Sequence, residues 1–471
     1  MVFFDELEKH GNMPALILED GRHISYHELL QSADRVAKEV PARSVVFLVC
    51  KNACMSVCGY VGLLRKKAVP VLVNGAVDSK LYEALIKQYR PSYILLPKEQ
   101  KEEYGRGQAV LEQDGYLLMR TSLADDYGVH DDLALLLTTS GSTGSPKLVR
   151  QSYKNIEANT KSIVEYLGIR QDDRAISTMP MSYTYGLSII NSHLYAGAAI
   201  ILTDRTLMDK AFWALFKEHG ATTFGGVPYI YEMLKKLRFE RMDLPSLRYL
   251  TQAGGKLSKE LSLEFADMLA KRGVGFVVMY GQTEATARMS YLPAEYAVEK
   301  AGSMGIAIPG GEFMLIDTDG SPITEAGKEG ELVYKGDNVT LGYAESCDDL
   351  IKGDENGGVL VTGDIAKRDE DGFYYITGRK KRFLKMYGNR INLDELERIL
   401  KAEGYECALC GQDDHMAIFV TREEDAQAAH ACASKKTGIH PSGFSVRYIP
   451  ELPRSEAGKV LYSELEKLCD V

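Results

Sequence analysis

The segment best suited to chemistry is a short run of hydroxyl residues and glycines that ends in a lysine. It reads Thr138-Thr139-Ser140-Gly141-Ser142-Thr143-Gly144-Ser145-Pro146-Lys147 and follows an expected buried strand. Backbone N–H groups, hydroxyl donors and one cation are what a loop needs to surround phosphate groups. The spacing is not that of a Walker A loop. A flexible Ser/Gly linker rarely joins a core strand to a helix, so we predict a phosphate-binding loop.

The elements expected around this loop are those of an α/β protein. Buried strands are predicted at residues 45–49, 134–137, 199–202 and 276–279, and helices at 154–167 and 259–270. From about residue 302, short strands broken by turn signals predict a small β-rich subdomain. We therefore expect a large N-terminal domain of layered α/β subdomains (1–379, with the β-rich part at about 302–379). A small, mobile α+β C-terminal domain should follow at 380–471.

Composition excludes several function classes. The 471 residues carry a net charge of −10, which does not favour a general attraction to nucleic acid or to an anionic membrane. No run approaches the ~18 apolar residues of a membrane-spanning helix, and the first residues do not form a signal peptide. Eight cysteines in a chain of this length do not indicate a disulfide framework, and Cys407-Ala-Leu-Cys410 is a lone pair. We expect a reducing, cytoplasmic compartment.

Further motifs lie along the chain in a fixed order. They are Pro14-Ala15-Leu16 with Ser25-Tyr26-His27-Glu28-Leu29, Ala253-Gly254-Gly255-Lys256, Tyr280-Gly281-Gln282-Thr283-Glu284, Gly330-Glu331-Leu332, Thr362-Gly363-Asp364, Gly378-Arg379 and Pro453-Arg454-Ser455-Glu456-Ala457-Gly458-Lys459. Together with residues 139–147 they resemble, almost end to end, the adenylate-forming superfamily of acyl-CoA synthetases, peptide-synthetase adenylation domains and luciferases. The pattern is closest to that of acyl- and aryl-acid CoA ligases.

The resemblance implies a nucleotide site. Tyr280 would offer an aromatic face to adenine. Thr283 would contact the α-phosphate, and Glu284 would hold Mg²⁺, which prefers hard oxygen ligands. Asp364 would accept hydrogen bonds from the ribose hydroxyls, and Arg379 would contact the ribose and the phosphate. The full set implied for ATP is Thr139, Ser140, Gly141, Ser142, Thr143, Gly144, Gly254, Gly255, Lys256, Tyr280, Gly281, Asp364 and Arg379.

Lysines complete the implied catalytic set. Lys147 closes the phosphate loop, and Lys459 would bridge the acid carboxylate and the α-phosphate, because a cation between two anions lowers their repulsion. The basic stretch 379–382 is a solvated face, a nucleic-acid patch or, by resemblance, a hinge with Lys381 at its pivot. The C-terminal domain would swing about it and present Lys459 for adenylation, then the segment beginning at Lys385 for thiol transfer.

The residues predicted to line the acid pocket differ from those common in the family. The expected lining is Tyr183, Tyr185, Gly225, Gly226 and Met279. Tyr183 stands where acyl-CoA synthetases commonly carry histidine, so a titrating role near neutral pH is lost. No aspartate is placed there to hold an ammonium group, which disfavours an α-amino acid. A mostly apolar pocket suits a fatty or an aromatic acid, and the sequence does not choose between them.

The resemblance implies an ATP-dependent, AMP-forming carboxylic acid ligase that needs Mg²⁺. A small-molecule acid would become an acyl-adenylate, and its acyl group would pass to a thiol, that of coenzyme A or of a phosphopantetheine arm on an acyl carrier protein. Neither nucleic acid nor membrane insertion is expected. A non-catalytic nucleotide-binding homologue is the alternative from another class. Intact Lys147, Glu284, Asp364, Arg379 and Lys459 argue against it.

Overall fold

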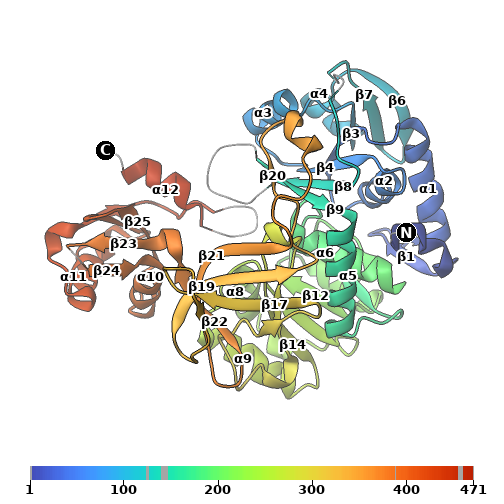
Figure 1. Cartoon of the computed structure of the whole chain (residues 1–471). Coiled ribbons are helices and arrows are strands. Elements are labelled where there is room, and N and C mark those ends of the chain that lie inside the picture. The colour runs from blue at the N-terminus through green and yellow to red at the C-terminus, as the bar shows by residue number, and fades with distance from the viewer. Residues whose placement is uncertain (1–2, 124–126, 139–146, 388, 455–459, 470–471) are drawn as a thin grey trace. The chain divides into compact units, whose positions relative to one another are not determined.

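The computed structural model describes residues 3–123, 127–138, 147–387, 389–454 and 460–469 (Figure 1). The chain divides into two compact units. The first holds the described residues of 1–139, 146–312 and 335–360, and the second holds those of 313–334 and 361–471. Sheets layered with helices confirm the predicted α/β class. No described helix is long and apolar enough to cross a membrane.

A nine-stranded sheet forms one layer of the first unit. Its order is β16 (Ile306–Ala307), β15 (Ser290–Leu292), β14 (Gly275–Tyr280), β13 (Tyr249–Gln252), β12 (Thr223–Gly226), β10 (Arg174–Ile176), β11 (Ala199–Ile201), β1 (Pro14–Ile17) and β2 (His23–Ser25). From β14 across to β1 every neighbouring pair is parallel. The carboxyl ends of these strands therefore meet at one edge, where ligands commonly bind in parallel sheets.

An eight-stranded sheet forms the second layer of this unit. Its order is β20 (Tyr343–Ala344), β9 (Leu148–Ser152), β8 (Leu133–Thr138), β4 (Val69–Asn74), β3 (Val45–Cys50), β5 (Tyr93–Pro97), β7 (Tyr116–Arg120) and β6 (Gln108–Gln113). β8, β4, β3 and β5 are parallel, and they read as apolar runs because helices cover both faces. The strands predicted at 45–49 and 134–137 are β3 and β8, and those at 199–202 and 276–279 are β11 and β14.

Several helices of the first unit begin at a residue whose side chain caps the first turn. Ser25 accepts from the backbone N–H of Glu28 at 3.2 Å, and Glu28 accepts from the N–H of Ser25 at 2.8 Å, a capping box. Ser152 and Asn155 form a similar pair. The helices are α1 (Tyr26–Glu39), α2 (Cys54–Arg65), α3 (Ser79–Tyr89), α4 (Lys101–Tyr104), α5 (Tyr153–Leu167), α6 (Thr184–Ala196), α7 (Lys210–Glu218), α8 (Pro228–Lys236) and α9 (Lys259–Ala270).

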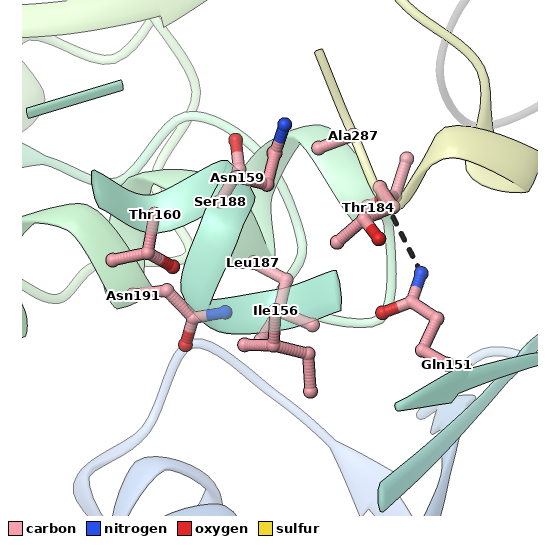
Figure 2. A pocket seen from close by; sticks show the side chains of 10 residues that line it. Gln151, Ile156, Asn159, Thr160, Thr184, Leu187, Ser188, Asn191 and Ala287 are labelled. Atoms are coloured by element: carbon pink, nitrogen blue, oxygen red, sulfur yellow. Dashed lines mark hydrogen bonds between the residues drawn. The ribbon is translucent and has the colours of Figure 1, made fainter. Parts of the chain in front are cut away.

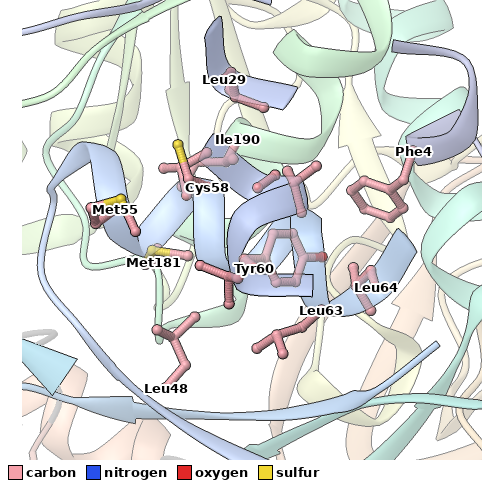
Figure 3. Packing of buried hydrophobic residues seen from close by; sticks show 14 of the residues in the cluster. Phe4, Leu29, Leu48, Met55, Cys58, Tyr60, Leu63, Leu64, Met181 and Ile190 are labelled. Atoms are coloured by element: carbon pink, nitrogen blue, oxygen red, sulfur yellow. The ribbon is translucent and has the colours of Figure 1, made fainter. Parts of the chain in front are cut away.

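The largest core cluster is built around α2, which is buried from Met55 to Leu64 (Figure 3). Met181 and Ile190 belong to the same cluster, so it extends along α6. Gly62 permits close packing of α2 on α1, since a Cβ there would lie 2.2 Å from the carbonyl oxygen of Ala33. Cys58 is a small buried residue of this core.

The second unit contains three smaller sheets. One is ordered β18 (Pro322–Ile323), β17 (Gly311–Ile316), β19 (Glu329–Gly336), β21 (Val359–Arg368) and β22 (Tyr374–Arg379); β23 (Phe383–Met386) pairs with β24 (Asn389–Asn392); and β25 (Cys407–Gln412), β26 (His415–Val420) and β27 (Phe444–Tyr448) form the third. The helices are α10 (Leu393–Ala402), α11 (Ala426–Thr437) and α12 (Tyr462–Cys469). The predicted domain boundary at 379/380 stays a prediction.

Cys407 and Cys410 face different cores. Cys407 packs in the cluster that contains α10 and α11, and Cys410 packs in the cluster that contains Leu465 of α12. This follows from the alternation of side chains along β25. In the part of the chain that the structure describes, no group of three His, Cys, Asp or Glu residues could hold a metal ion.

Candidate active site

Predicted site residues of the first unit gather at the carboxyl edge of the nine-stranded sheet. Gly226 of β12 lies opposite Gln252 of β13, and Gln252 lies opposite Val278 of β14. The segments that follow β13 and β14 therefore leave the sheet side by side. The structure brings together here Gly225, Gly226, Gly254, Gly255, Lys256, Tyr280 and Gly281.

The turn after β13 depends on glycine. Gly254 has a φ of +81°, and a Cβ there would lie 2.6 Å from the hydroxyl of Tyr183 and 2.9 Å from Cγ1 of Val227. The amide Nε2 of Gln252 donates to the carbonyl oxygen of Gly255 at 2.9 Å and closes the turn. A small residue is thus required where the backbone approaches the predicted acid pocket.

The turn after β14 holds Thr283 and Glu284 in a 3₁₀ turn, Thr283–Ala285. The hydroxyl of Tyr343 donates to Oε1 of Glu284 at 2.5 Å. The backbone N–H and the hydroxyl of Thr340 both donate to the carbonyl oxygen of Glu284 at 2.9 Å. Main chain and carboxylate of Glu284 are therefore both fixed by residues 340–343. One carboxylate oxygen, Oε2, has no hydrogen bond within the described residues.

Thr286 anchors the end of this turn and lines a small polar cavity, which Figure 2 shows from close by. Its carbonyl oxygen accepts from Nε2 of Gln151 at 3.2 Å and from the hydroxyl of Thr184. Its own hydroxyl donates to the carbonyl oxygen of Asn338 at 2.7 Å. The lining comes from β9, α5 and α6 as well as the turn, and consists of Gln151, Ile156, Asn159, Thr160, Thr184, Leu187, Ser188, Asn191, Thr286 and Ala287. Strands and helices of both layers thus position Glu284.

The predicted phosphate loop is described only at its end. Lys147 Nζ lies 2.6 Å from Oε1 of Glu345, and both side chains are exposed. Thr139, Ser140, Gly141, Ser142, Thr143 and Gly144 lie outside the described residues. β8 and β9, which flank them, pair in an antiparallel ladder. The loop therefore joins two core strands; a strand-to-helix junction was the expectation.

Tyr183 and Tyr185 lie beside the carboxyl edge. The hydroxyl of Tyr185 is 2.8 Å from Oγ1 of Thr251, and a Cβ on Gly225 would lie 2.7 Å from that hydroxyl. Burial raises the pKa of Tyr183 to about 12 and also raises that of Tyr185. Both are neutral near pH 7, in keeping with the expectation that this position does not titrate. Met279 lies in the same cluster.

A second cavity adjoins this edge, and sequence reasoning missed its polar residues. Arg288, His193 and Tyr249 line it together with Gly225 and Thr251. Arg288 follows Glu284 by four residues. This short spacing could have identified it from the sequence as a site residue, because an arginine near the motif could reach the site. Its burial depends on packing against α5 and α6, which the sequence pattern does not reveal.

In the second unit Asp364 and Arg379 are paired across β21 and β22. Oδ1 of Asp364 lies 3.2 Å from Nε of Arg379. The aspartate side chain is 5% exposed and the arginine side chain is 65% exposed, so the pair offers its cationic end to solvent. The predicted ribose contacts of both residues stay predictions.

The basic stretch after β22 is divided among separate acidic partners. Lys380 Nζ lies 2.8 Å from Oε2 of Glu331. Arg382 is buried, with Nε 2.9 Å from Oδ1 of Asp394 and Nη2 2.5 Å from Oε1 of Glu397. The stretch is therefore not one continuous basic patch.

The structure does not test the roles predicted for the remaining lysines. Lys381 lies in the 3₁₀ turn Lys380–Arg382, and Lys385 lies on β23. Lys459 lies outside the described residues.

Known proteins resemble this chain over nearly its whole length. The family model of AMP-binding enzymes matches residues 3–344. A 2-succinylbenzoate–CoA ligase of Bacillus cereus is 28% identical over 473 residues, covering 93% of this chain and 96% of the relative. A medium-chain fatty-acid–CoA ligase of Escherichia coli is 27% identical over 464 residues, covering 92% and 80%. The O-succinylbenzoate coenzyme A synthetase of Bacillus subtilis in complex with AMP superposes with a TM-score of 0.80 at 22% identity, covering 98% of each chain.

The fold is that of an adenylate-forming enzyme. The chain belongs to the family of AMP-binding enzymes. It is an AMP-forming ligase of a carboxylic acid with a thiol, as the sequence predicted.

Proposed function

We propose that this enzyme is an ATP-dependent acid–coenzyme A ligase. In the first step the substrate carboxylate attacks the α-phosphorus of ATP, forms the acyl-adenylate and expels pyrophosphate. In the second step the thiol of coenzyme A attacks the acyl carbonyl and expels AMP. Positioning and charge stabilisation supply most of the rate in such phosphoryl chemistry.

The observation that carries this proposal is the arrangement at the sheet edge. Glu284, fixed by Tyr343 and Thr340, lies on the segment that follows Tyr280, beside the glycine turn at Gly254. An aromatic face, an open backbone turn and an oriented carboxylate are what an adenylate site needs. The two curated relatives act, by their names, on 2-succinylbenzoate and on a medium-chain fatty acid, with coenzyme A as the thiol source.

Glu284 also fits a Mg²⁺ ion. Its carboxylate is oriented by Tyr343, and Oε2 has no hydrogen bond in the described part of the chain. Bound there, Mg²⁺ would neutralise charge on the phosphates. Thr283 would donate to the α-phosphate, and Lys147 with residues 139–144 would hold the β- and γ-phosphates. Lys459 would place its ammonium between the carboxylate and the α-phosphate.

The second unit would complete both steps. Asp364 and Arg379 would hold the ribose, since the carboxylate can accept from two hydroxyls. Rotation about Lys381 would exchange Lys459 for the segment at Lys385, so one site could serve both half-reactions. The proposal places the enzyme in a reducing cytoplasm, and its eight cysteines are free thiols.

The test is acid-dependent release of pyrophosphate with a panel of fatty, aromatic and amino acids, with and without coenzyme A. We expect one acid class to give turnover with AMP as the second product. Lys459→Ala should slow pyrophosphate release by about a hundredfold or more, because it removes a cation from the transition state. Lys467→Ala changes an exposed lysine of α12 and is the matched control.

The acceptor is decided in the same assay. Multiple turnovers with coenzyme A support the proposal. An adenylate that coenzyme A cannot discharge would point to a carrier-protein phosphopantetheine. If no acid elicits pyrophosphate, calorimetry with Mg·ATP separates a missed substrate from a non-catalytic nucleotide-binding protein.

A further inference from the structure

Arg288 is a buried arginine that has no acidic partner among the residues that the structure describes. Its side chain is 2% exposed. Arg150 and Arg382 are also buried, and each forms an ion pair with a glutamate, Glu355 and Glu397 respectively. Within the described residues no carboxylate lies within 4.0 Å of the Arg288 guanidinium. Since a buried charge is normally paired, Arg288 needs an explanation.

Neutral groups hold the guanidinium of Arg288 in one orientation. Nε donates to the hydroxyl of Ser188 at 3.2 Å, and Nη1 donates to the hydroxyl of Tyr166 at 3.2 Å. The guanidinium carbon lies 5.1 Å from the ring centre of Tyr185, a cation–π contact. Nη2 makes no hydrogen bond in the part of the chain that the structure describes. These contacts orient the cation without neutralising it.

The cavity beside Arg288 is small, with about 10 Å³ of accessible space, roughly the room of one water molecule. Apart from Arg288, its described lining contains no charged side chain. The hydroxyl of Tyr249 and Nε2 of His193 line it and have no hydrogen-bond partner within the described residues. Nδ1 of His193 lies 2.8 Å from the carbonyl oxygen of Ile189, so Nδ1 carries the proton and Nε2 offers a lone pair. Unused polar groups therefore surround a single fixed cation.

The cavity shares Gly225 with the predicted acid pocket. Gly225 and Thr251 line it at the ends of β12 and β13. Gly225 is also part of the predicted acid pocket, and Thr251 holds the hydroxyl of Tyr185. An acid whose reacting carboxylate lies at the sheet edge would direct its other end toward this cavity.

We propose that the acid activated by this enzyme carries a second anionic group, a carboxylate or a sulfonate, and that Arg288 binds it. The proposal rests on the proposed acid ligase function. A guanidinium and a carboxylate form a directed, charge-assisted pair, and Tyr249 supplies one more donor. An acid without the second anion leaves Arg288 buried and unpaired, so the site rejects it.

The experiment compares matched acids that differ in one group. The pairs are malonate with propionate, succinate with butyrate, and isophthalate with 3-methylbenzoate. The readout is the ratio of kcat/KM for acid-dependent pyrophosphate release, diacid over monoacid, in the full-length enzyme. We expect the wild-type ratio to exceed about 10 in at least one pair, and Arg288→Met to lower it about a hundredfold.

Two further variants separate binding from folding. Arg288→Lys keeps the charge but loses the planar fork, so it should recover part of the ratio. Tyr249→Phe removes one donor with little change of volume and should lower the ratio about fivefold. Circular dichroism and the Tm report whether each variant is folded.

The outcomes are distinct. If the wild-type enzyme prefers the monoacid in every pair, the proposed role of Arg288 is wrong while the ligase function stands. The same conclusion follows if Arg288→Met and Arg288→Lys leave the diacid-over-monoacid ratio of kcat/KM unchanged. If neither kind of acid elicits pyrophosphate, the proposed function fails, and this proposal fails with it.

Discussion

At the scale of single residues, Tyr343 orients a carboxylate without neutralising it. Its hydroxyl lies 2.5 Å from Oε1 of Glu284. Burial, together with the negative charge of Glu284, raises the pKa of Tyr343, so the hydroxyl stays protonated and remains a donor. A lysine at this place would cancel the charge that a divalent cation needs. A neutral donor leaves Glu284 able to act as a ligand.

Tyr343→Phe should therefore weaken the binding of Mg²⁺, although the carboxylate of Glu284 is still present. We expect the Mg²⁺ concentration for half-maximal pyrophosphate release to rise about tenfold, a typical effect of removing a partner that orients a ligand. Glu284→Gln removes the anionic ligand itself and should lower kcat/KM for ATP about a hundredfold. Tyr448→Phe, at an exposed position of β27, is the control. An unaltered Mg²⁺ dependence in Tyr343→Phe would contradict the orienting role.

At the scale of elements, the turn after β14 stores backbone strain. Thr286 has φ +66° and ψ −61°, and the N–H of Ala287 donates to the carbonyl oxygen of Ala285 at 2.7 Å, which is a γ-turn. This conformation is rare and strained for a residue with a Cβ. Hydrogen bonds from Gln151 and Thr184 hold it in place. The geometry that positions Glu284 is thus maintained by its neighbours.

Three variants of Thr286 separate strain from hydrogen bonding. Thr286→Ala loses the bond to Asn338 and keeps the strain, so the free energy of unfolding should fall by about 1–2 kcal/mol. Thr286→Gly also loses the bond but relieves the positive φ, which should recover about 1 kcal/mol. Thr286→Ser keeps the hydroxyl and serves as the control. Urea unfolding, followed by the fluorescence of Trp213, the one tryptophan, ranks the three variants by their free energy of unfolding. Glycine less stable than alanine would argue against strain.

β25 and α12 place two cysteines against each other. Sγ of Cys410 lies 2.7 Å from Sγ of Cys469. Burial and the neighbouring Cys469 raise the pKa of Cys410, so its thiolate is scarce near neutral pH and oxidation should be slow. The pair remains positioned for a disulfide whenever an oxidant is supplied.

Diamide treatment should link these two cysteines. The reagent accepts the two thiol hydrogens, so the intact mass should fall by about 2 Da, and peptide mapping should join Cys410 to Cys469. The link closes a long loop and should stabilise the second unit by about 2–4 kcal/mol. Cys469→Ser should abolish the link, and Cys432→Ser should not. A linked pair that excludes Cys469 would contradict the geometry.

At the scale of the whole molecule, those parts of the site were predictable that depend on sequence patterns within a few neighbouring residues. The strands at 276–279 and 199–202 and the turn at Gly254 follow from apolar runs and glycine chemistry within a few residues. The burial of Arg288 was not predictable, because it depends on contacts with Ser188 of α6 and Tyr166 of α5, which lie 100 and 122 positions away in the sequence. The same is true of Tyr343, whose contact with Glu284 joins distant segments. The roles of residues 139–144 and Lys459 stay predictions.

The acid sensitivity of the first unit tests the packing of α6. Burial lowers the pKa of His193 to about 4, below its usual value of 6.5. As pH falls from about 6.5 toward 4, His193 becomes protonated in the unfolded chain but stays neutral in the folded one. The free energy of unfolding therefore decreases in this window and is unaffected above it. Between pH 7 and pH 5 the loss should be about 2 kcal/mol in the free energy of unfolding. His193→Asn keeps a donor for the carbonyl of Ile189 and should remove this loss, whereas His415→Asn, at an exposed position, should retain it. Urea unfolding at both pH values, followed at Trp213, measures the difference, and an equal loss in His193→Asn would mean that His193 is not the group that titrates.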